Sequence, residues 1–448
     1  MPLTISTIRD VAERQLCCGC GACAYVSPDE IEMVDTLEYG RRPLLPEGPP
    51  QDPRSDEALH VCPGIELRHT YDRKQPGLIR ELEAGWGPIL EVWEAYAADA
   101  DIRFAASSGG AATALVLFCV ERLGFRGILH IAARPDVPYL NHTVLSTTRA
   151  EIIARTGSRY APASPCDGLK LIEDAAGPCA FIGKPCDVAG ALMAARLRPK
   201  LAEKLGLTIA IFCAGTPTTR ATLGLLRKLG IGDSSRVLSL RYRGHGWPGR
   251  FVVRFLAADG TEQERSLSYE ESWACLANDK QWRCHICPDH TGEFADIAVG
   301  DPWYREIPSG EPGRSLVVVR TERGMSSVQS AGQAGFLTME RAAPAVLPSS
   351  QPNLLAARGA VWGRRLALRC VGIPVPRFVG LPLFRWWRTV LSAAERTQTV
   401  FGAVRRVFRR RLNQRVPVRR YGAPSARHPR DYLAQASAGE AAEAVSHG

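Results

Sequence analysis

The sequence predicts an α/β fold in which a mixed sheet with covering helices forms the body of the protein. Three observations indicate it. Between residues 89 and 229, apolar runs of strand length alternate with helical patterns. Cysteines gather at short spacings at residues 17–23 and 284–287, on either side of this region. Arginines concentrate after residue 360, which predicts a basic tail.

A chain of 448 residues is too long for one ordinary domain. We expect four parts: 1–80, 81–165, 166–345 and 346–448, the last partly disordered, above all beyond Arg415. No secretory signal is visible, and the longest apolar runs, such as 113–120, are too short to span a bilayer. We therefore expect a cytoplasmic protein, where thiols stay reduced. Fourteen cysteines in that setting favour metal binding over disulfides.

The N-terminal part carries the sequence CCGCGAC at residues 17–23. Cys17, Cys20 and Cys23 have the spacing of a bacterial ferredoxin loop, and Cys62, which precedes a proline, fits the fourth ligand. The interleaved glycines let the backbone wrap closely round a cluster. A ferredoxin-like iron-sulfur segment is therefore the favoured interpretation, with a zinc knuckle or unligated thiols as alternatives. Cys18 is an additional thiol that could substitute for one of the ligands.

The first α/β unit has a strand at 89–98, a small-residue loop, a helix at 111–123 and a strand at 127–133. The loop reads AASSGG and ends at Gly110. Free amides at a helix N-terminus attract phosphate, so Ser107 to Gly110 form a candidate phosphate site. The alternative is that Ser107 or Ser108 only caps the helix. After a helix at 149–155, the turn TGSRY at 156–160 could contact a cofactor, or Arg159 could simply lie on the surface.

A second α/β unit has helices at 167–175, 188–197 and 218–229 and strands at 179–182 and 207–212. Cys186 and Cys213 follow the ends of these two strands, where ligands gather in open α/β sheets. Singly, each cysteine would be a small buried hydrophobe. The later C-x-x-C pair, Cys284 and Cys287, adds two thiols whose spacing suits zinc, an iron-sulfur cluster or a redox disulfide.

Two further features are a shaped loop and the tail. The loop GHGWPG at 244–249 joins strands at 236–243 and 251–257; His245 and Trp247 could face a flat ring there, or the loop could be a plain hairpin connection. Later strands are expected at 316–320 and 335–339. The arginine-rich, aromatic segments after residue 385 resemble a basic amphipathic segment that binds an anionic membrane surface or an acidic protein partner. Nothing else in the chain supports nucleic-acid binding.

Taken together, these motifs resemble the coenzyme F-420 hydrogenase/dehydrogenase beta-subunit family, which includes reductases of chlorophyll intermediates. The resemblance covers roughly residues 14–340. It rests on the following pieces, in the order of the family: LCCGCGAC, VCPG, SSGGAATAL, TGSRYAPASP, FIGKPCDVAGA, IFCAG, YRGHGWPG and RCHICPDHTGEFADIAVGDPW.

The resemblance implies an iron-sulfur flavoprotein oxidoreductase that binds FAD and 4Fe-4S clusters. The implied ligands of one cluster are Cys186, Cys213, Cys284 and Cys287, and a second cluster would use Cys17, Cys20, Cys23 and Cys62. The implied FAD-binding residues are Ser107, Ser108, Gly109, Gly110, Thr113, Thr156, Gly157, Ser158, Arg159, Tyr160, Gly183 and Lys184. Lys184, which could stabilise charge on the reduced flavin, and His245, as proton donor, are the candidate catalytic residues.

We expect electrons to pass between an external donor, the clusters, FAD and an unidentified organic substrate near the GHGWPG loop. The donor would be a ferredoxin or reduced deazaflavin. One alternative is a subunit of a larger complex that oxidises or reduces coenzyme F-420. Another is a non-catalytic electron-transfer or scaffold subunit that docks through its basic tail, with a peripheral membrane location. A structural zinc protein is a third.

One departure from the family concerns the GHGWPG loop, which often reads G-N-G-C-P-G in other members. His245 replaces the asparagine and Trp247 the cysteine. The bulky indole is expected to narrow a substrate pocket, so the substrate of the chlorophyll-intermediate reductases does not transfer to this chain.

Overall fold

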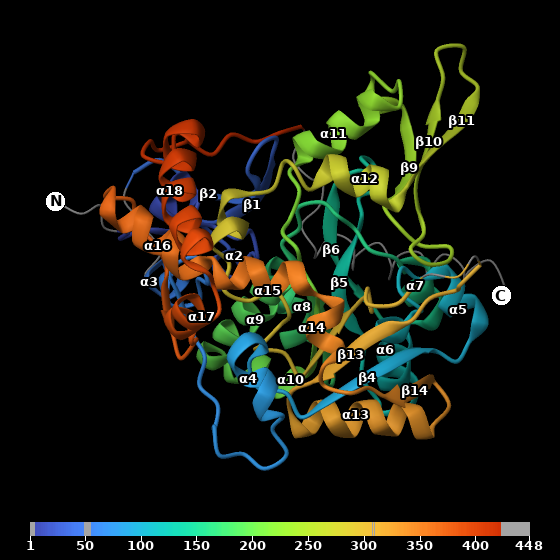
Figure 1. Ribbon diagram of the computed structural model, residues 1–448. Helices are drawn as coiled ribbons and strands as arrows, with labels where there is room; N and C mark the ends of the chain where they lie inside the picture. The colour runs from blue at the N-terminus through green and yellow to red at the C-terminus, as the bar shows by residue number, and fades with distance from the viewer. Residues whose placement is uncertain (1–4, 49–54, 307, 309, 423–448) are drawn as a thin grey trace.

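A computed structural model describes residues 5–48, 55–306, 308 and 310–422. Its centre is an eight-stranded mixed sheet with the order β14-β4-β13-β12-β8-β7-β5-β6 (Figure 1). The strands are β4 (Glu91–Ala97), β5 (Ile128–Ala133), β6 (Asn141–Ser146), β7 (Cys179–Gly183), β8 (Leu205–Ile211), β12 (Ile297–Gly300), β13 (Ser315–Val319) and β14 (Leu337–Arg341). The mixed α/β fold expected from the sequence is confirmed.

Strands β12, β8, β7 and β5 are parallel neighbours, and antiparallel strands lie on both sides of them. β4 runs antiparallel to β13, so it points the same way as the four parallel strands. The carboxyl ends of five strands therefore meet at one edge of the sheet, where α/β proteins place their ligands.

Helices cover both faces of the sheet because successive strand residues point to opposite sides. In β13, Leu316 and Val318 join one apolar core, and Val317 and Val319 join the other. One face is covered by α6 (Ala111–Arg122) and α13 (Glu322–Gln333), and the other by α8 (Leu169–Glu173), α9 (Pro185–Leu197) and α10 (Pro199–Lys204). The 3-10 turn η1 (Pro165–Gly168) precedes α8, so the expected helix at 167–175 forms in two pieces.

A smaller three-stranded sheet stands at the top of the molecule in Figure 1. It consists of β9 (Val237–Arg241), β10 (Arg250–Leu256) and β11 (Glu262–Ser268), all antiparallel. α11 (Thr219–Lys228) and α12 (Tyr269–Leu276) pack beside it around a third apolar core. The GHGWPG loop joins β9 to β10 and points its residues back to the edge of the main sheet.

The N-terminal segment contains α1 (Ile8–Glu13), α2 (Ala22–Val26), β1 (Glu32–Thr36), β2 (Gly40–Leu44), α3 (Ser55–His60), β3 (Glu66–Arg68) and α4 (Arg80–Trp86). β1 and β2 form an antiparallel hairpin. α2 packs on α9 and η1, so the cysteine-rich loop lies against the helices of the main body. α5 (Ala100–Ala105) and α7 (Arg149–Ala154) complete the elements before the second unit.

The C-terminal part is largely helical up to Arg410. It forms α14 (Val346–Ser350), α15 (Pro352–Gly359), α16 (Val361–Cys370), β15 (Arg377–Val379), α17 (Leu383–Thr389) and α18 (Ala393–Arg410). α16, α17 and α18 lie beside the N-terminal segment at the left of Figure 1, and β15 pairs with β3.

Residues 416–422 lie in the stretch after Arg415 where disorder is expected, and that expectation stays a prediction. They form no helix or strand, but the Val416 amide donates to the Glu13 carbonyl (2.9 Å) and the Tyr421 amide to the Asp35 carbonyl (2.8 Å). Residues 423–448, where disorder was also expected, lie outside the described part. None of the described helices is long and apolar enough to cross a membrane.

Candidate active site

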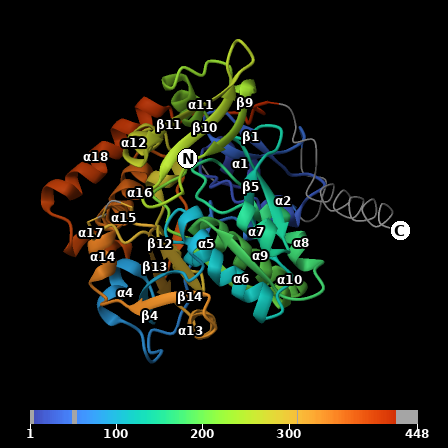
Figure 2. The ribbon, with the colours of Figure 1, turned by 90° about the vertical axis from the view of Figure 1, so that its right-hand side faces the viewer.

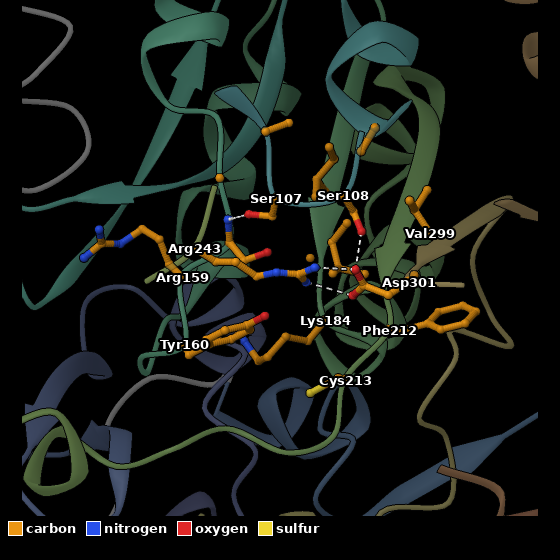
Figure 3. Close-up of a pocket in the computed structure, with 18 of the residues that line it drawn as sticks. Ser107, Ser108, Arg159, Tyr160, Lys184, Phe212, Cys213, Arg243, Val299 and Asp301 are labelled. Carbon is orange, nitrogen blue, oxygen red and sulfur yellow. Dashed lines mark hydrogen bonds and ion pairs between the residues drawn. The ribbon is translucent and has the colours of Figure 1, made fainter. Parts of the chain in front are cut away.

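A cavity of about 310 Å³ opens at the carboxyl edge of the main sheet (Figure 3). Its walls come from the loop between α5 and α6, the ends of β7, β8 and β12, and the residues that follow these strands. Of the expected FAD-binding residues, the following line it: Ser107, Ser108, Gly110, Thr113, Thr156, Gly157, Ser158, Arg159, Tyr160, Gly183 and Lys184. The structure thus brings together segments that are nearly 80 residues apart in the chain.

The Ser-Gly loop leaves the N-terminus of α6 open to this cavity. Gly110 is the N-cap residue, and no side chain caps the helix. Ser107 instead accepts a hydrogen bond from the Ser158 amide (2.6 Å), and Ser108 donates to Asp301. The capping alternative for these serines is therefore wrong. The uncapped amides and the helix dipole make this end of the cavity favourable for an anion such as phosphate.

Gly109 lies behind the cavity wall and sets the path of the loop. Its φ is +69°, and an added Cβ would lie 2.6 Å from the carbonyl oxygen of Gly313. Only glycine fits both this backbone conformation and this close approach.

A buried ion pair fixes the cavity wall. Arg243, 1% exposed, donates two hydrogen bonds to Asp301, which follows β12 (Nη1–Oδ2 2.8 Å, Nη2–Oδ1 2.5 Å). Burial by itself would lower the pKa of Arg243, but the adjacent Asp301 carboxylate raises it, so the guanidinium stays charged. The Arg243 guanidinium also lies over the rings of Tyr269 and Trp303 (4.8 and 5.2 Å).

Trp247 belongs to the support of this wall. Its indole Nε1 donates to Asp301 (2.8 Å), and its ring stacks on Trp303 at 5.3 Å. Trp247 lines neither this cavity nor the larger, basic cavity on the far side of the 156–160 turn. Trp247 thus narrows neither of these two cavities, and the expectation that it narrows a substrate pocket stays a prediction. The indole replaces the family cysteine with a packing contact and a hydrogen bond.

Lys184 places a cation between the cavity and two cysteines. Its Nζ lies 2.6 Å from Oδ2 of Asp187, on the first turn of α9. Burial would lower the pKa of Lys184, but the attraction of Asp187, Cys186 and Cys213 raises it. A charged ammonium at this position can stabilise negative charge that develops in the cavity.

Arg159 is neither a plain surface residue nor directed mainly at the first cavity. Its guanidinium donates to Asn141 Oδ1 and to the carbonyls of Pro138 (2.7 Å) and Leu140 (3.3 Å). These bonds hold the 156–160 turn in place between the first cavity and the second one.

The second cavity, of about 780 Å³, lies on the other side of that turn. Its lining is strongly basic, with Arg155, Arg159, Arg241, Arg243, Arg254, His142 and His245 against Glu151 and Glu264. His245 lines only this second cavity, where it is exposed and stacks on Phe104 (5.6 Å, interplanar angle 5°). Burial and the nearby Arg241 guanidinium lower the pKa of His245.

The cysteines form two neighbouring groups below the first cavity. In the N-terminal segment, the Cys23 thiol lies within electrostatic reach of Cys17 and Cys62, and all three are buried. The Cys20 thiol interacts instead with the thiols of Cys18 and Cys166. The expected four ligands of the N-terminal loop are thus three close neighbours and one thiol that faces η1.

The second group surrounds the floor of the first cavity. Cys213 lines the cavity (Figure 3). Its thiol interacts electrostatically with that of Cys284, which in turn interacts with Cys287. Cys186 lies beside Lys184, and its thiol interacts with that of Cys18. Cys18, which sequence reasoning left unassigned, therefore connects the two groups.

Buried cations next to these thiols fit an anionic iron-sulfur cluster. Arg42 and Arg283 are each 2% exposed, and both interact electrostatically with Cys17. Neither arginine forms an ion pair among the described residues. Three of their nitrogen atoms also lack a hydrogen-bond partner there: Nε and Nη2 of Arg42 and Nε of Arg283. Buried charge of this kind is costly unless an opposite charge offsets it. Four thiolates holding a cluster would supply that charge.

Within the described residues, no three His, Cys, Asp or Glu side chains converge to hold a single metal ion. A 4Fe-4S cluster places a cube of iron and sulfide between its thiolates, so its ligands need not converge on one point. Both cysteine groups offer thiolates, which are the usual ligands of such a cluster.

Comparison with known proteins assigns the family. The model of the coenzyme F-420 hydrogenase/dehydrogenase beta-subunit N-terminus matches residues 92–170, and that of the C-terminus matches residues 178–345. The chain belongs to this family. Its members are electron-transfer subunits related to oxidoreductases, and the recognition from sequence motifs is confirmed.

Individual family members are distant from this chain. Uncharacterized protein MJ0725 of Methanocaldococcus jannaschii is 22% identical over 50% of this chain and 82% of its own length. The coenzyme F-420 hydrogenase subunit beta of Methanosarcina barkeri is 24% identical over 53% of this chain and 77% of its own. A chain of the F-420-reducing [NiFe] hydrogenase complex from Methanosarcina barkeri shares the fold, with a TM-score of 0.50, 19% identity, and coverage of 66% of this chain and 98% of that chain.

Sequence reasoning missed the residues that support the cavity. Arg243, Tyr269, Asp301 and Trp303 line it, yet none was a candidate. Asp301 and Trp303 stand in the DPW motif that follows β12, at the same sheet edge as Cys186 and Cys213. Their place after a strand was the available signal.

Proposed function

We propose that this protein is an oxidoreductase that binds FAD in the first cavity and a 4Fe-4S cluster at Cys186, Cys213, Cys284 and Cys287. The observation that carries the proposal is the position of Cys213 at the floor of the cavity, with the uncapped N-terminus of α6 at another wall. A bound flavin can exchange one electron with a cluster and two with an organic substrate.

Each wall of the cavity has a defined task in this proposal. The α6 amides and the Ser107–Gly110 loop bind the cofactor phosphates. Arg243 and Asp301 hold the loop, the end of β12 and the GHGWPG loop in one arrangement through hydrogen bonds. Lys184 keeps a positive charge between the cavity and Cys186, where it stabilises a more negative, reduced site.

The second cavity is the proposed substrate site. It shares the 155–159 turn and Arg243 with the first cavity, so a substrate there would lie next to the cofactor. Its arginines favour a substrate that carries carboxylate or phosphate groups. His245 is the candidate proton donor because its imidazole lies at this cavity.

The N-terminal cysteines are the proposed ligands of a second 4Fe-4S cluster, nearer the external donor. Cys17, Cys23 and Cys62 lie together, and either Cys20 or Cys18 would turn to complete the set. Cys18 contacts Cys186, so the second cluster would stand next to the first. A ferredoxin-like protein is the proposed donor.

The test is to purify the Cys213→Ser variant without oxygen, beside native protein and a Cys370→Ser control. Cys370 is exposed at the end of α16 and belongs to neither proposed ligand set. The proposal predicts that Cys213→Ser loses about four irons per chain, retains FAD and no longer transfers electrons from reduced ferredoxin to the flavin. Full iron content in Cys213→Ser, or equal iron loss in Cys370→Ser, would contradict the ligand assignment.

A second candidate is a subunit that oxidises or reduces coenzyme F-420. The name of the Methanosarcina barkeri relative and the basic second cavity favour it, since this deazaflavin carries an anionic side chain. Under this candidate, reduced coenzyme F-420 bleaches the bound flavin within one turnover in native protein. Loss of that reaction in Arg241→Gln, with FAD content unchanged, would place the coenzyme in the second cavity.

A further inference from the structure

The charge of this chain is unevenly distributed. Residues 360–422 contain fifteen arginines and one glutamate, whereas the formal charge of the whole chain is only +10. The rest of the protein is therefore net negative. This basic segment follows the part that matches the family models, which ends at residue 345.

The same segment exposes apolar side chains. Of the twelve exposed large hydrophobic residues in the described part, six lie within residues 366–408: Leu366, Val371, Phe384, Val390, Phe401 and Phe408. The last two, on α18, are 69% and 66% exposed. Exposed aromatic groups of this size mark interaction surfaces when they gather.

α18 arranges these groups on one face. Phe401, Arg405, Phe408 and Arg409 are all exposed and fall on a single side of the helix by their spacing. The opposite side buries Ala403 and Val407 against the protein. One face of α18 therefore packs against the protein, and the opposite face, which is basic and aromatic, is exposed.

This face lies over the turn that carries the C-x-x-C pair. α16 packs on the 3-10 turn η3 (Trp282–Ile286), and Arg364 donates to the His285 carbonyl (2.7 Å). At the end of α18, Arg410 donates to the Lys280 carbonyl (3.1 Å). The helices α18 and α16 therefore lie between the open face and the proposed cluster site.

We infer that this face of α18, formed by Phe401, Arg405, Phe408 and Arg409, docks an acidic electron-carrier protein. The inference rests on the proposed function, because it identifies where electrons reach the cysteine groups. Arginines with aromatic residues are typical of protein interfaces. A carrier with surface carboxylates complements the charge and would sit close to Cys284 and Cys287. A lipid surface would gain nothing from that position.

The test measures binding of the full-length native protein to an acidic bacterial two-cluster ferredoxin and to an acidic flavodoxin by calorimetry. The variants are Arg405→Gln/Arg409→Gln and Phe401→Ser/Phe408→Ser. The matched control is Arg196→Gln/Lys200→Gln, at exposed positions near α10, which Figure 2 shows on the opposite side from α18. Circular dichroism verifies that each variant is folded.

We expect native protein and the control to bind at least one carrier, more weakly as salt rises, and each α18 variant to bind about tenfold more weakly. Failure of native protein to bind either carrier would overturn the inference, as would unchanged binding by both variants. A third overturning result is binding to phosphatidylglycerol vesicles that the α18 substitutions abolish while carrier binding persists. Binding does not require flavin reduction, so a failed docking site is distinguishable from a failed oxidoreductase assignment.

Discussion

The Arg243–Asp301 pair gives a sharp test of how the cavity wall is held. In Asp301→Asn, the side chain keeps its shape but loses its charge. Arg243, whose side chain is 2% exposed, would then keep its guanidinium buried without a counter-charge. Removing one partner of a buried ion pair typically costs about 3–5 kcal/mol. Asp301 also accepts hydrogen bonds from Ser108 and Trp247. The substitution would therefore also weaken the contacts of Asp301 with the Ser107–Gly110 loop and with the GHGWPG loop.

The assay is urea unfolding followed by circular dichroism, with FAD affinity measured on the same samples. The matched control is Glu262→Gln, which breaks the exposed Arg254–Glu262 pair, whose side chains are 53% and 45% exposed. Exposed pairs contribute about 0–1 kcal/mol. We expect Asp301→Asn to be destabilised by several times more than the control and to bind FAD more weakly.

A double variant, Arg243→Met/Asp301→Leu, separates lost charge pairing from lost packing. It removes both charges, so it should be more stable than Asp301→Asn alone. If Asp301→Asn unfolds at the same urea concentration as Glu262→Gln, the pair does not hold the wall and the reasoning is refuted.

Three other predictions concern the loop, pH and the N-terminal cysteines. Gly109→Ala forces a Cβ against the Gly313 carbonyl, so FAD affinity should fall at least tenfold, whereas unchanged affinity would show that the loop shifts freely. Burial lowers the pKa of His69 to about 4, so between pH 6.5 and 4 the unfolded chain binds a proton there that the folded chain does not. The free energy of unfolding should therefore be about 2 kcal/mol lower at pH 5 than at pH 7 because of this group. Urea titrations at both pH values should show that this loss is absent in the His69→Gln variant. Cys23→Ser should lose about four irons per chain, and native iron content in that variant would exclude Cys23 as a ligand.

Much of the framework was predictable because it depends on local patterns. Strands β4, β5, β7 and β8 and helix α6 lie within a few residues of their predicted positions, since apolar periodicity and glycine loops define them. The convergence of their loops follows from parallel strands having a common carboxyl edge.

The remainder depends on contacts between distant residues, which no local pattern contains. β13 separates β12 from β4, and this strand order is visible only in the folded chain. Arg243 meets Asp301 across 58 positions. Arg415 donates to Glu13 across 402 positions, a contact that the sequence around either residue does not indicate.

The loop at 244–249 shows the same limit within the site. Its glycines and proline identified it as a shaped loop. The directions of its side chains were not predictable, because Trp247 turns toward Asp301 and Trp303 while His245 turns toward Phe104 and the second cavity.

The most direct test of the central claim is the cofactor content of native protein purified without oxygen. The account predicts about eight irons with matching sulfide, and one FAD, in each chain. About four irons with FAD would leave one cysteine group without a cluster, and comparison of Cys17→Ser with Cys284→Ser would identify which. Protein that holds neither iron nor flavin after reconstitution would contradict the claim that this family member is an iron-sulfur flavoprotein.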